Sequence, residues 1–145
     1  MPLSNSTHGH GSELWINTGA GLIRVAQVDD IPELPTSSER ELYETSNFDT
    51  EEFREWKKLP LKDGTPITIR GNYVINSASD AVLQAADDAE GALPYKIVLK
   101  EGAGVFECAG TGLFYNFKRM NPADAKRTFE ITLKPVDAAL ITPVV

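Results

Sequence analysis

The sequence predicts a mainly β fold, a β-sandwich or barrel of about seven strands with one flanking α-helix. Several short segments alternate apolar and polar residues with a period of two, which is typical of strands that bury one face. Glycine-containing turns such as TGAG and EGAG separate these segments. Only the segment 77–91 breaks the alternation with the spacing of a helix.

The first two expected strands, 12–17 and 22–28, are joined by a glycine turn of hairpin length. Pro32 and Pro35 then require an extended connection. The next segment, 39–45, is expected at an edge because its charged side chains need solvent. The remaining expected strands are 65–75, 94–100, 105–110, 112–120 and 127–136.

The expected helix has recognisable ends. Ser77 or Ser79 can cap its N-terminus, and Asp80 is favourable in the first turn. Gly91 can end the helix in a left-handed conformation. One modest apolar stripe is expected to face the sheet, formed by Val82, Ala86 and Ala89.

The chain is expected to form one domain over residues 12–136, with flexible arms at 1–11 and 137–145. The segment 46–63 inside this domain is too polar for a core and too long for a simple turn. It is therefore expected to be a long loop that is dispensable for folding. Trp15 is expected in the core, and Trp56 is expected to anchor the loop.

The charge of the chain argues against nucleic-acid binding. The formal net charge is −7, and residues 1–63 hold 12 acids against 6 bases. A protein without a basic surface cannot displace the counterions of phosphates. No segment approaches the ~20 apolar residues of a membrane span, and the N-terminus lacks the apolar run of a signal peptide.

Catalytic and metal-binding patterns are missing from the sequence. Cys108, the single cysteine, lies in a strand-like setting and is expected to be an inert, partly buried thiol. His8 and His10 lie among glycines, where a flexible arm is the better interpretation than a metal site. The glycine-rich segments lack the lysine and following helix of a phosphate-binding loop. We therefore expect no enzyme activity, no metal and no cofactor.

The order of these elements resembles the major tail tube protein of lambda-type siphophages, phages with long non-contractile tails. The resemblance covers about residues 12–138 and depends on order and spacing. Its residues are SELWI, a strand ending in VAQVDDIPEL, the polar loop YETSNFDTEEFREW, the single helix and LPYKIVLKEGAGVFECAGTG before a last alternating strand.

The resemblance implies a structural virion protein whose hexameric rings stack into the tail tube, the conduit for DNA ejection into the host. It implies assembly in the host cytoplasm and contacts with the tail tip or baseplate, tape measure and tail terminator proteins. DNA would pass through the lumen without specific binding. The alternatives are a monomeric β-sandwich binding or accessory module, a single-ring tail or head–tail completion protein, and a tube protein of the type VI secretion kind.

Two groups of residues are candidates for these roles. Aromatic anchors among charges are favourable for contacts between rings, and the loop candidates are Phe48, Phe53 and Trp56. A merely solvated insertion is the alternative for this loop. A smooth, acidic channel wall would repel phosphates, and the candidate lumen residues are Thr68, Arg70, Asn72, Thr128, Glu130 and Thr132. Arg70 and Lys134 are compatible with such a wall only if neighbouring carboxylates neutralise them.

Overall fold

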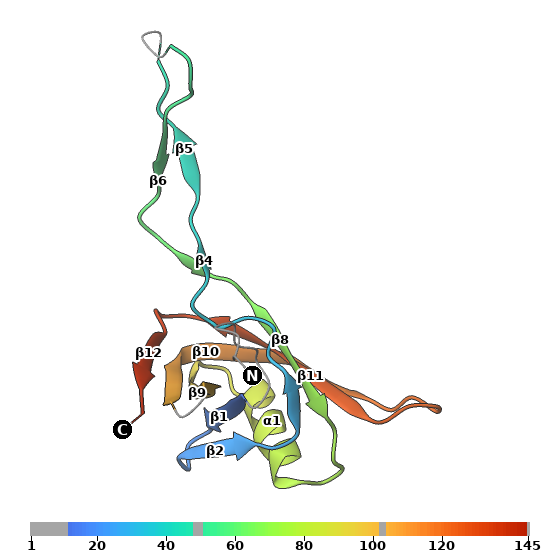
Figure 1. The fold of residues 1–145 in the computed structure, drawn as a ribbon. Coiled ribbons are helices and arrows are strands. Elements are labelled where there is room, and N and C mark those ends of the chain that lie inside the picture. Colours follow the sequence, from blue (N-terminus) through green and yellow to red (C-terminus); the bar gives the residue numbers. More distant parts are fainter. Residues whose placement is uncertain (1–11, 48–50, 102–103, 145) are drawn as a thin grey trace, which may run out of the picture.

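A computed structural model describes residues 12–47, 51–101 and 104–144, and in this part of the chain it shows strands and a single α-helix (Figure 1). The predicted fold class is confirmed, because the main sheet curls into a half-barrel against which the helix packs. The elements of this body are β1 (Glu13–Asn17), β2 (Leu22–Val25), β3 (Val28–Asp30), β8 (Ile67–Asn72), α1 (Ala78–Asp88), β9 (Leu93–Glu101), β10 (Gly104–Met120), β11 (Thr128–Pro135) and β12 (Leu140–Pro143).

The main sheet is antiparallel, with the strand order β2-β1-β9-β10-β11-β8-β3 and with β12 paired to part of β10. β2 and β3 lie at opposite ends of this order, although only Ala26 and Gln27 separate them in the chain. The two ends of the sheet must therefore approach each other. This short connection explains why the sheet is curled and not flat.

The core lies between the inner face of the sheet and the helix. On β8, Ile67 and Ile69 are buried while Arg70 is exposed, and on β11 Phe129 and Ile131 are buried. This alternation matches the predicted period of two. The buried apolar cluster consists of Leu14, Ile16, Val25, Ile67, Ile69, Val82, Leu83, Ala86, Tyr95, Ile97, Cys108, Phe114, Phe129, Ile131 and Leu133.

The helix α1 begins as predicted and ends earlier than predicted. Ser77 is its N-cap, and its side chain accepts a hydrogen bond from the Asp80 N–H. Ser79 has another role, since its Oγ accepts from the Ala26 N–H at 2.8 Å. The predicted left-handed end at Gly91 is wrong, because the helix ends at Ala89 in an extended conformation. Its buried side chains are Val82, Leu83 and Ala86.

Two strand predictions change because the chain must turn corners. The expected strand 22–28 is divided into β2 and β3 by a turn at Gln27, whose φ of 63° is left-handed. The expected strands 105–110 and 112–120 are instead one continuous strand, β10. The register of β10 against β11 shifts between Tyr115 and Lys118, and Asn116 there has φ 55°. This bulge bends the long strand without ending it.

The single cysteine is buried as predicted, but Trp15 is not in the core. Cys108 has no exposed surface, and its burial raises the pKa of the thiol. Trp15 lies on the outer face of β1, because its neighbours Leu14 and Ile16 occupy the inner face. The Lys96 ammonium lies 4.9 Å from the centroid of the Trp15 ring. The alternation of β1 therefore outweighs the size of the indole.

Residues 37–65 leave the body as a long two-stranded ribbon, which we call the arm (Figure 1). Of the segment expected as a loop, 46–63, the described residues 51–63 form the returning chain of this ribbon, and residues 48–50 lie outside the described residues. The predicted pairing of 39–45 is realised by β4 and β5. The strands of the arm are β4 (Ser38–Glu39), β5 (Leu42–Glu44), β6 (Trp56–Lys58) and β7 (Asp63–Gly64), with β4 paired to β7 and β5 to β6.

The C-terminal segment also has a place in the sheet. Instead of the free arm expected at 137–145, residues 140–143 pair with β10 as β12. All four of these residues are exposed. The expected N-terminal arm, 1–11, lies outside the described residues.

A side chain at Gly71 is expected to overpack the body where β3, β8 and β11 meet. A Cβ there would contact the backbone oxygen of Gln27 and lie 2.7 Å from Cε1 of Phe129. We expect Gly71→Ala to lower the free energy of unfolding by about 1–3 kcal/mol, measured by thermal denaturation. Gly91→Ala is the control, since nothing lies within 4 Å of its Cβ. Equal melting temperatures for the two variants would contradict this packing.

Candidate assembly surfaces

Backbone hydrogen bonds tie the two chains of the arm together along its length. Outside its strands, such bonds link Thr45 to Glu55 at 2.8 Å, Leu59 to Glu41 at 2.8 Å and Thr65 to Ser37 at 3.1 Å. The Glu55 N–H also donates to Ser46 Oγ at 2.7 Å. A two-stranded ribbon without a sheet or helix beneath it is only marginally stable in water. The arm would therefore gain most of its order from a partner surface.

The arm exposes large apolar side chains. Phe53 is 83% exposed and Trp56 is 52% exposed, so neither belongs to the core of the subunit. Leu42 pairs with Lys58, and Trp56 pairs with Glu44 two positions further along the ribbon. Residues two positions apart on a strand share a face, so Leu42 and Trp56 lie on the same side of the arm. Phe48, the third predicted anchor, lies outside the described residues.

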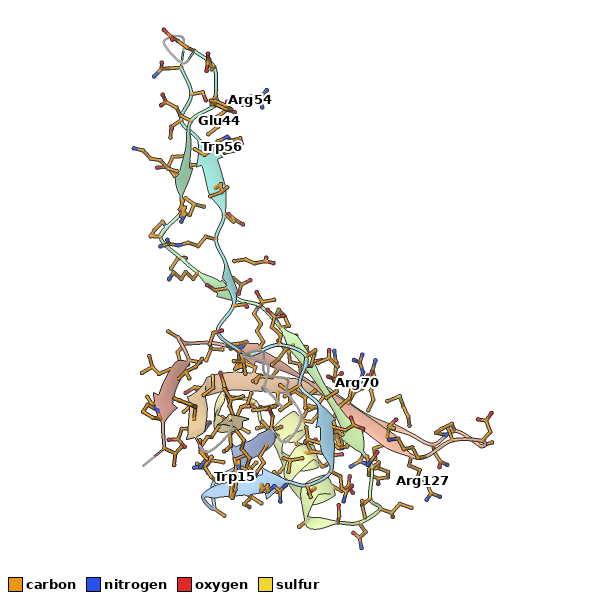
Figure 2. All side chains as sticks on the ribbon, in the orientation of Figure 1. Trp15, Glu44, Arg54, Trp56, Arg70 and Arg127 are labelled. Carbon is orange, nitrogen blue, oxygen red and sulfur yellow. The ribbon has the colours of Figure 1, made fainter. Side chains whose placement is uncertain are left out.

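Charges of opposite sign are distributed unevenly along the arm. Its distal half, residues 41–58, holds six acids and three bases in the sequence. Figure 2 shows Glu44, Arg54 and Trp56 close together there, and Arg54 Nε lies 3.9 Å from Glu44 Oε1. Lys62, in the part of the arm next to the body, has no hydrogen bond or ion pair to the described chain. The distal half therefore presents apolar side chains in an acidic setting.

The six predicted lumen residues are brought together on one outward face. β8 and β11 are neighbours, and their register pairs the six as Thr68 with Thr132, Arg70 with Glu130 and Asn72 with Thr128. The side chains on the opposite face of both strands are in the core. The sequence predicts which face is polar, but only the register shows that these residues form one continuous surface.

Ion pairs neutralise the basic side chain in the middle of this face. Arg70 Nε lies 3.1 Å from Glu130 Oε2, and Arg70 Nη1 lies 3.8 Å from Asp30 Oδ2. Lys118 of the adjacent strand β10 shares Glu130, with 3.8 Å between Nζ and Oε1. Two bases and two acids therefore balance, so this face does not supply the acidic excess that we expected of a channel wall.

Lys134 is also paired with a carboxylate. Its Nζ lies 3.0 Å from Asp63 Oδ1 at the base of the arm. Arg70 and Lys134 therefore both have the carboxylate partners that a DNA-repelling wall requires of them. Such exposed pairs add little stability, about 0–1 kcal/mol each, but they remove isolated positive charge.

Two further exposed apolar groups have no counterpart in the sequence-based predictions. Val74 and Ile75 lie in the turn between β8 and α1 and are 50% and 59% exposed. Leu140 and Ile141 of β12 are 67% and 49% exposed. The sequence places the run YVI at the end of the expected strand 65–75, but β8 ends at Asn72 and leaves these residues in a turn. A lone sequence cannot tell exposed apolar residues, here or in the apolar tail, from buried ones.

The described residues offer little support for catalysis. No group of three or more histidine, cysteine, aspartate or glutamate side chains that could hold a metal ion is found among them. Burial raises the pKa of Tyr95 above its ordinary range, and nearby Cys108 and Asp137 act in the same direction. Neither Tyr95 nor Cys108 is therefore an activated nucleophile. In this part of the chain α1 is too short and too polar to span a bilayer.

Comparisons with solved structures identify the fold. The chain is similar to a protein in the tail of an empty gene transfer agent particle, refined with C6 symmetry, at a TM-score of 0.69 and 12% identity over 94% of this chain and 99% of that one. It is also similar to a protein of the sixfold-symmetrised anti-feeding prophage baseplate, at a TM-score of 0.70 and 9% identity over 97% of each chain.

A third similar chain belongs to the virion of a native gene transfer agent particle, with a TM-score of 0.69, 11% identity and coverage of 94% of this chain and 99% of that one. No protein-family model matches the sequence, and no curated protein matches it. At such low identities the similarity shows a shared fold, and function must be argued separately.

Proposed function

We propose that this chain is the repeating subunit of a tail tube, a structural virion protein without enzyme activity. The observation that carries the proposal is the fold, which is shared over 94–97% of the chain with proteins of a C6-symmetric tail and of a sixfold-symmetrised baseplate. The finer assignment to lambda-type siphophages depends on the order of sequence elements.

Ring formation is supported by the exposed edges of the sheet. β12 places Leu140 and Ile141 on an edge with no further strand among the described residues, and β3 is only three residues long. An open edge with apolar side chains is a hazard for a monomer. A head-to-tail contact repeated by rotation covers such edges and closes into a ring. The sixfold symmetry of the similar tails makes a hexamer the proposed ring.

Ring stacking is supported by the arm. It projects from the body and exposes Phe53 and Trp56. Too few apolar side chains of the same subunit surround these two residues to bury them. Contacts outside the ring plane require such a projection. In the proposed particle the tube meets the tail tip or baseplate at one end and the terminator at the other. The tape measure protein and then DNA occupy the lumen.

Electron microscopy of the concentrated protein tests the proposal. We expect hollow tubes of stacked hexameric rings. A species that remains near 15.9 kDa at every concentration, with the tail-tip complex supplied as well as without it, would instead favour a monomeric binding module. Single rings that never stack would favour a completion protein. Either outcome contradicts the tube function.

A further inference from the structure

The arm and an apolar turn leave opposite ends of the same strand. The returning chain of the arm leads directly into β8 at Ile67, and β8 ends at Asn72, where the turn 73–76 leads into α1. β8 has six residues, so about 20 Å of extended chain separates its ends. Figure 1 shows the arm rising from one side of the body and this turn lying on the opposite side. The molecule therefore has two distinct poles.

The turn at the second pole displays apolar side chains on a fixed backbone. Val74 and Ile75 are both at least half exposed, and the sequence from 72 to 77 contains no charged residue. The Tyr73 N–H donates to the Arg127 carbonyl at 3.1 Å, and Asn76 takes a left-handed φ of 54°. The turn is thus anchored at both ends, to β11 and to the capped helix. Two apolar side chains are held toward solvent without a partner in the described chain.

Basic side chains flank this turn. The Arg127 Nε donates to Asn121 Oδ1 at 2.8 Å and has no carboxylate partner in the described chain. Figure 2 shows Arg127 on the side of the body away from the arm. Lys126 is next to it, two-thirds exposed and 3.6 Å from Asp29. The distal half of the arm, in contrast, holds twice as many acids as bases. Lys126 is thus already paired, and Arg127 is the positive charge beside the turn without a carboxylate partner, opposite in sign to the net charge of the distal half of the arm. Both poles also expose apolar side chains.

We propose that the turn 73–76 is the receptor for the described residues in the distal half of the arm, 41–47 and 51–58, of a second copy in the adjacent ring. The inference rests on the proposed tube function and names the surface that the arm binds. Because the two surfaces differ and lie at opposite poles, the contact repeats along a line and does not close between two copies. Acidic side chains of the arm would then face Arg127, which fixes the direction of stacking.

Cysteine crosslinking tests this contact without removing the aromatic anchors. Lys58→Cys lies on the same face of the arm as Trp56 and is combined with Ile75→Cys, which keeps a small apolar side chain at the turn. Cys108 is fully buried and does not compete for the reagent. With a short bismaleimide added to assembled tubes, we expect a ladder of covalent multimers on a denaturing gel. The control pair is Lys58→Cys with Glu90→Cys, which places the second thiol at an exposed position beyond the end of α1.

A ladder longer than dimers requires that both cysteines of each copy react with different neighbours. We expect it from the pair 58 and 75, and we expect at most dimers from either single variant and from the control pair. Tubes that are visible by electron microscopy but give no ladder with the pair 58 and 75 would overturn the receptor assignment and leave the tube function intact. A failure of the unmodified protein to form any tube, with the tail-tip complex supplied as well as without it, would overturn both.

Discussion

Replacement of both Phe53 and Trp56 by alanine is expected to abolish tube elongation while the melting temperature of the free subunit stays nearly unchanged. Both side chains are largely exposed and lie outside the buried cluster. Their removal therefore takes almost nothing from the folded subunit. In a stack, burial of each side chain contributes about 2 kcal/mol. Six such arms act together in each ring, so many weak contacts make elongation cooperative.

The measurement pairs thermal denaturation of the subunit with electron microscopy of the concentrated protein. Phe129→Ala is the contrasting variant, because it truncates an aromatic residue that is only 2% exposed. It is expected to lose about 3–5 kcal/mol of stability and to fail before assembly is reached. If the arm variant also unfolds, its aromatic residues belong to the subunit's own stability. If it still forms long tubes, the arm does not hold the rings together.

The body could be predicted from the sequence because its information is local. Alternation along 67–72 and 128–135 sets which face is buried, and Ser77 with Asp80 sets the start of the helix. Curvature is not local in this sense. The turn at Gln27 joins strands that lie at opposite ends of the sheet. The residue types in the segment 22–28 do not predict this turn. The prediction for Trp15 failed for another reason, because it followed the size of the indole, whereas the alternation with the buried Leu14 and Ile16 places Trp15 on the outer face of β1.

The candidate surfaces were predicted unevenly, again because part of the information is not local. The aromatic residues of the arm were recognisable because they interrupt a charged segment, but its ribbon depends on pairing between positions 42–44 and 56–58. The β8–β11 face depends on a register of two strands that are far apart in sequence. The apolar turn 73–76 was hidden, because YVI extends a strand pattern and only the structure shows that the strand ends at Asn72.

Glu130→Lys is expected to convert a tube that excludes DNA into one that retains it, if the β8–β11 face lines the lumen. Glu130 is the carboxylate that Arg70 and Lys118 share, at 3.1 Å and 3.8 Å. Its replacement removes one negative charge, adds one positive charge and leaves both bases without this partner. In a hexamer this change occurs six times per ring, on one continuous wall. Phosphates then meet a field that holds them, with the steep salt dependence of counterion release.

The experiment assembles tubes in the presence of short linear duplex DNA, digests with nuclease and measures the protected DNA at increasing salt. Glu90→Lys is the matched control, because it makes the same charge change at an exposed position beyond the end of α1. Unmodified tubes and Glu90→Lys tubes are expected to protect none. Glu130→Lys tubes are expected to protect DNA at low salt and release it as salt rises. Equal protection by both variants, or none by Glu130→Lys, would place the lumen on another face of the subunit, since only a wall residue can change the potential that DNA meets inside the tube.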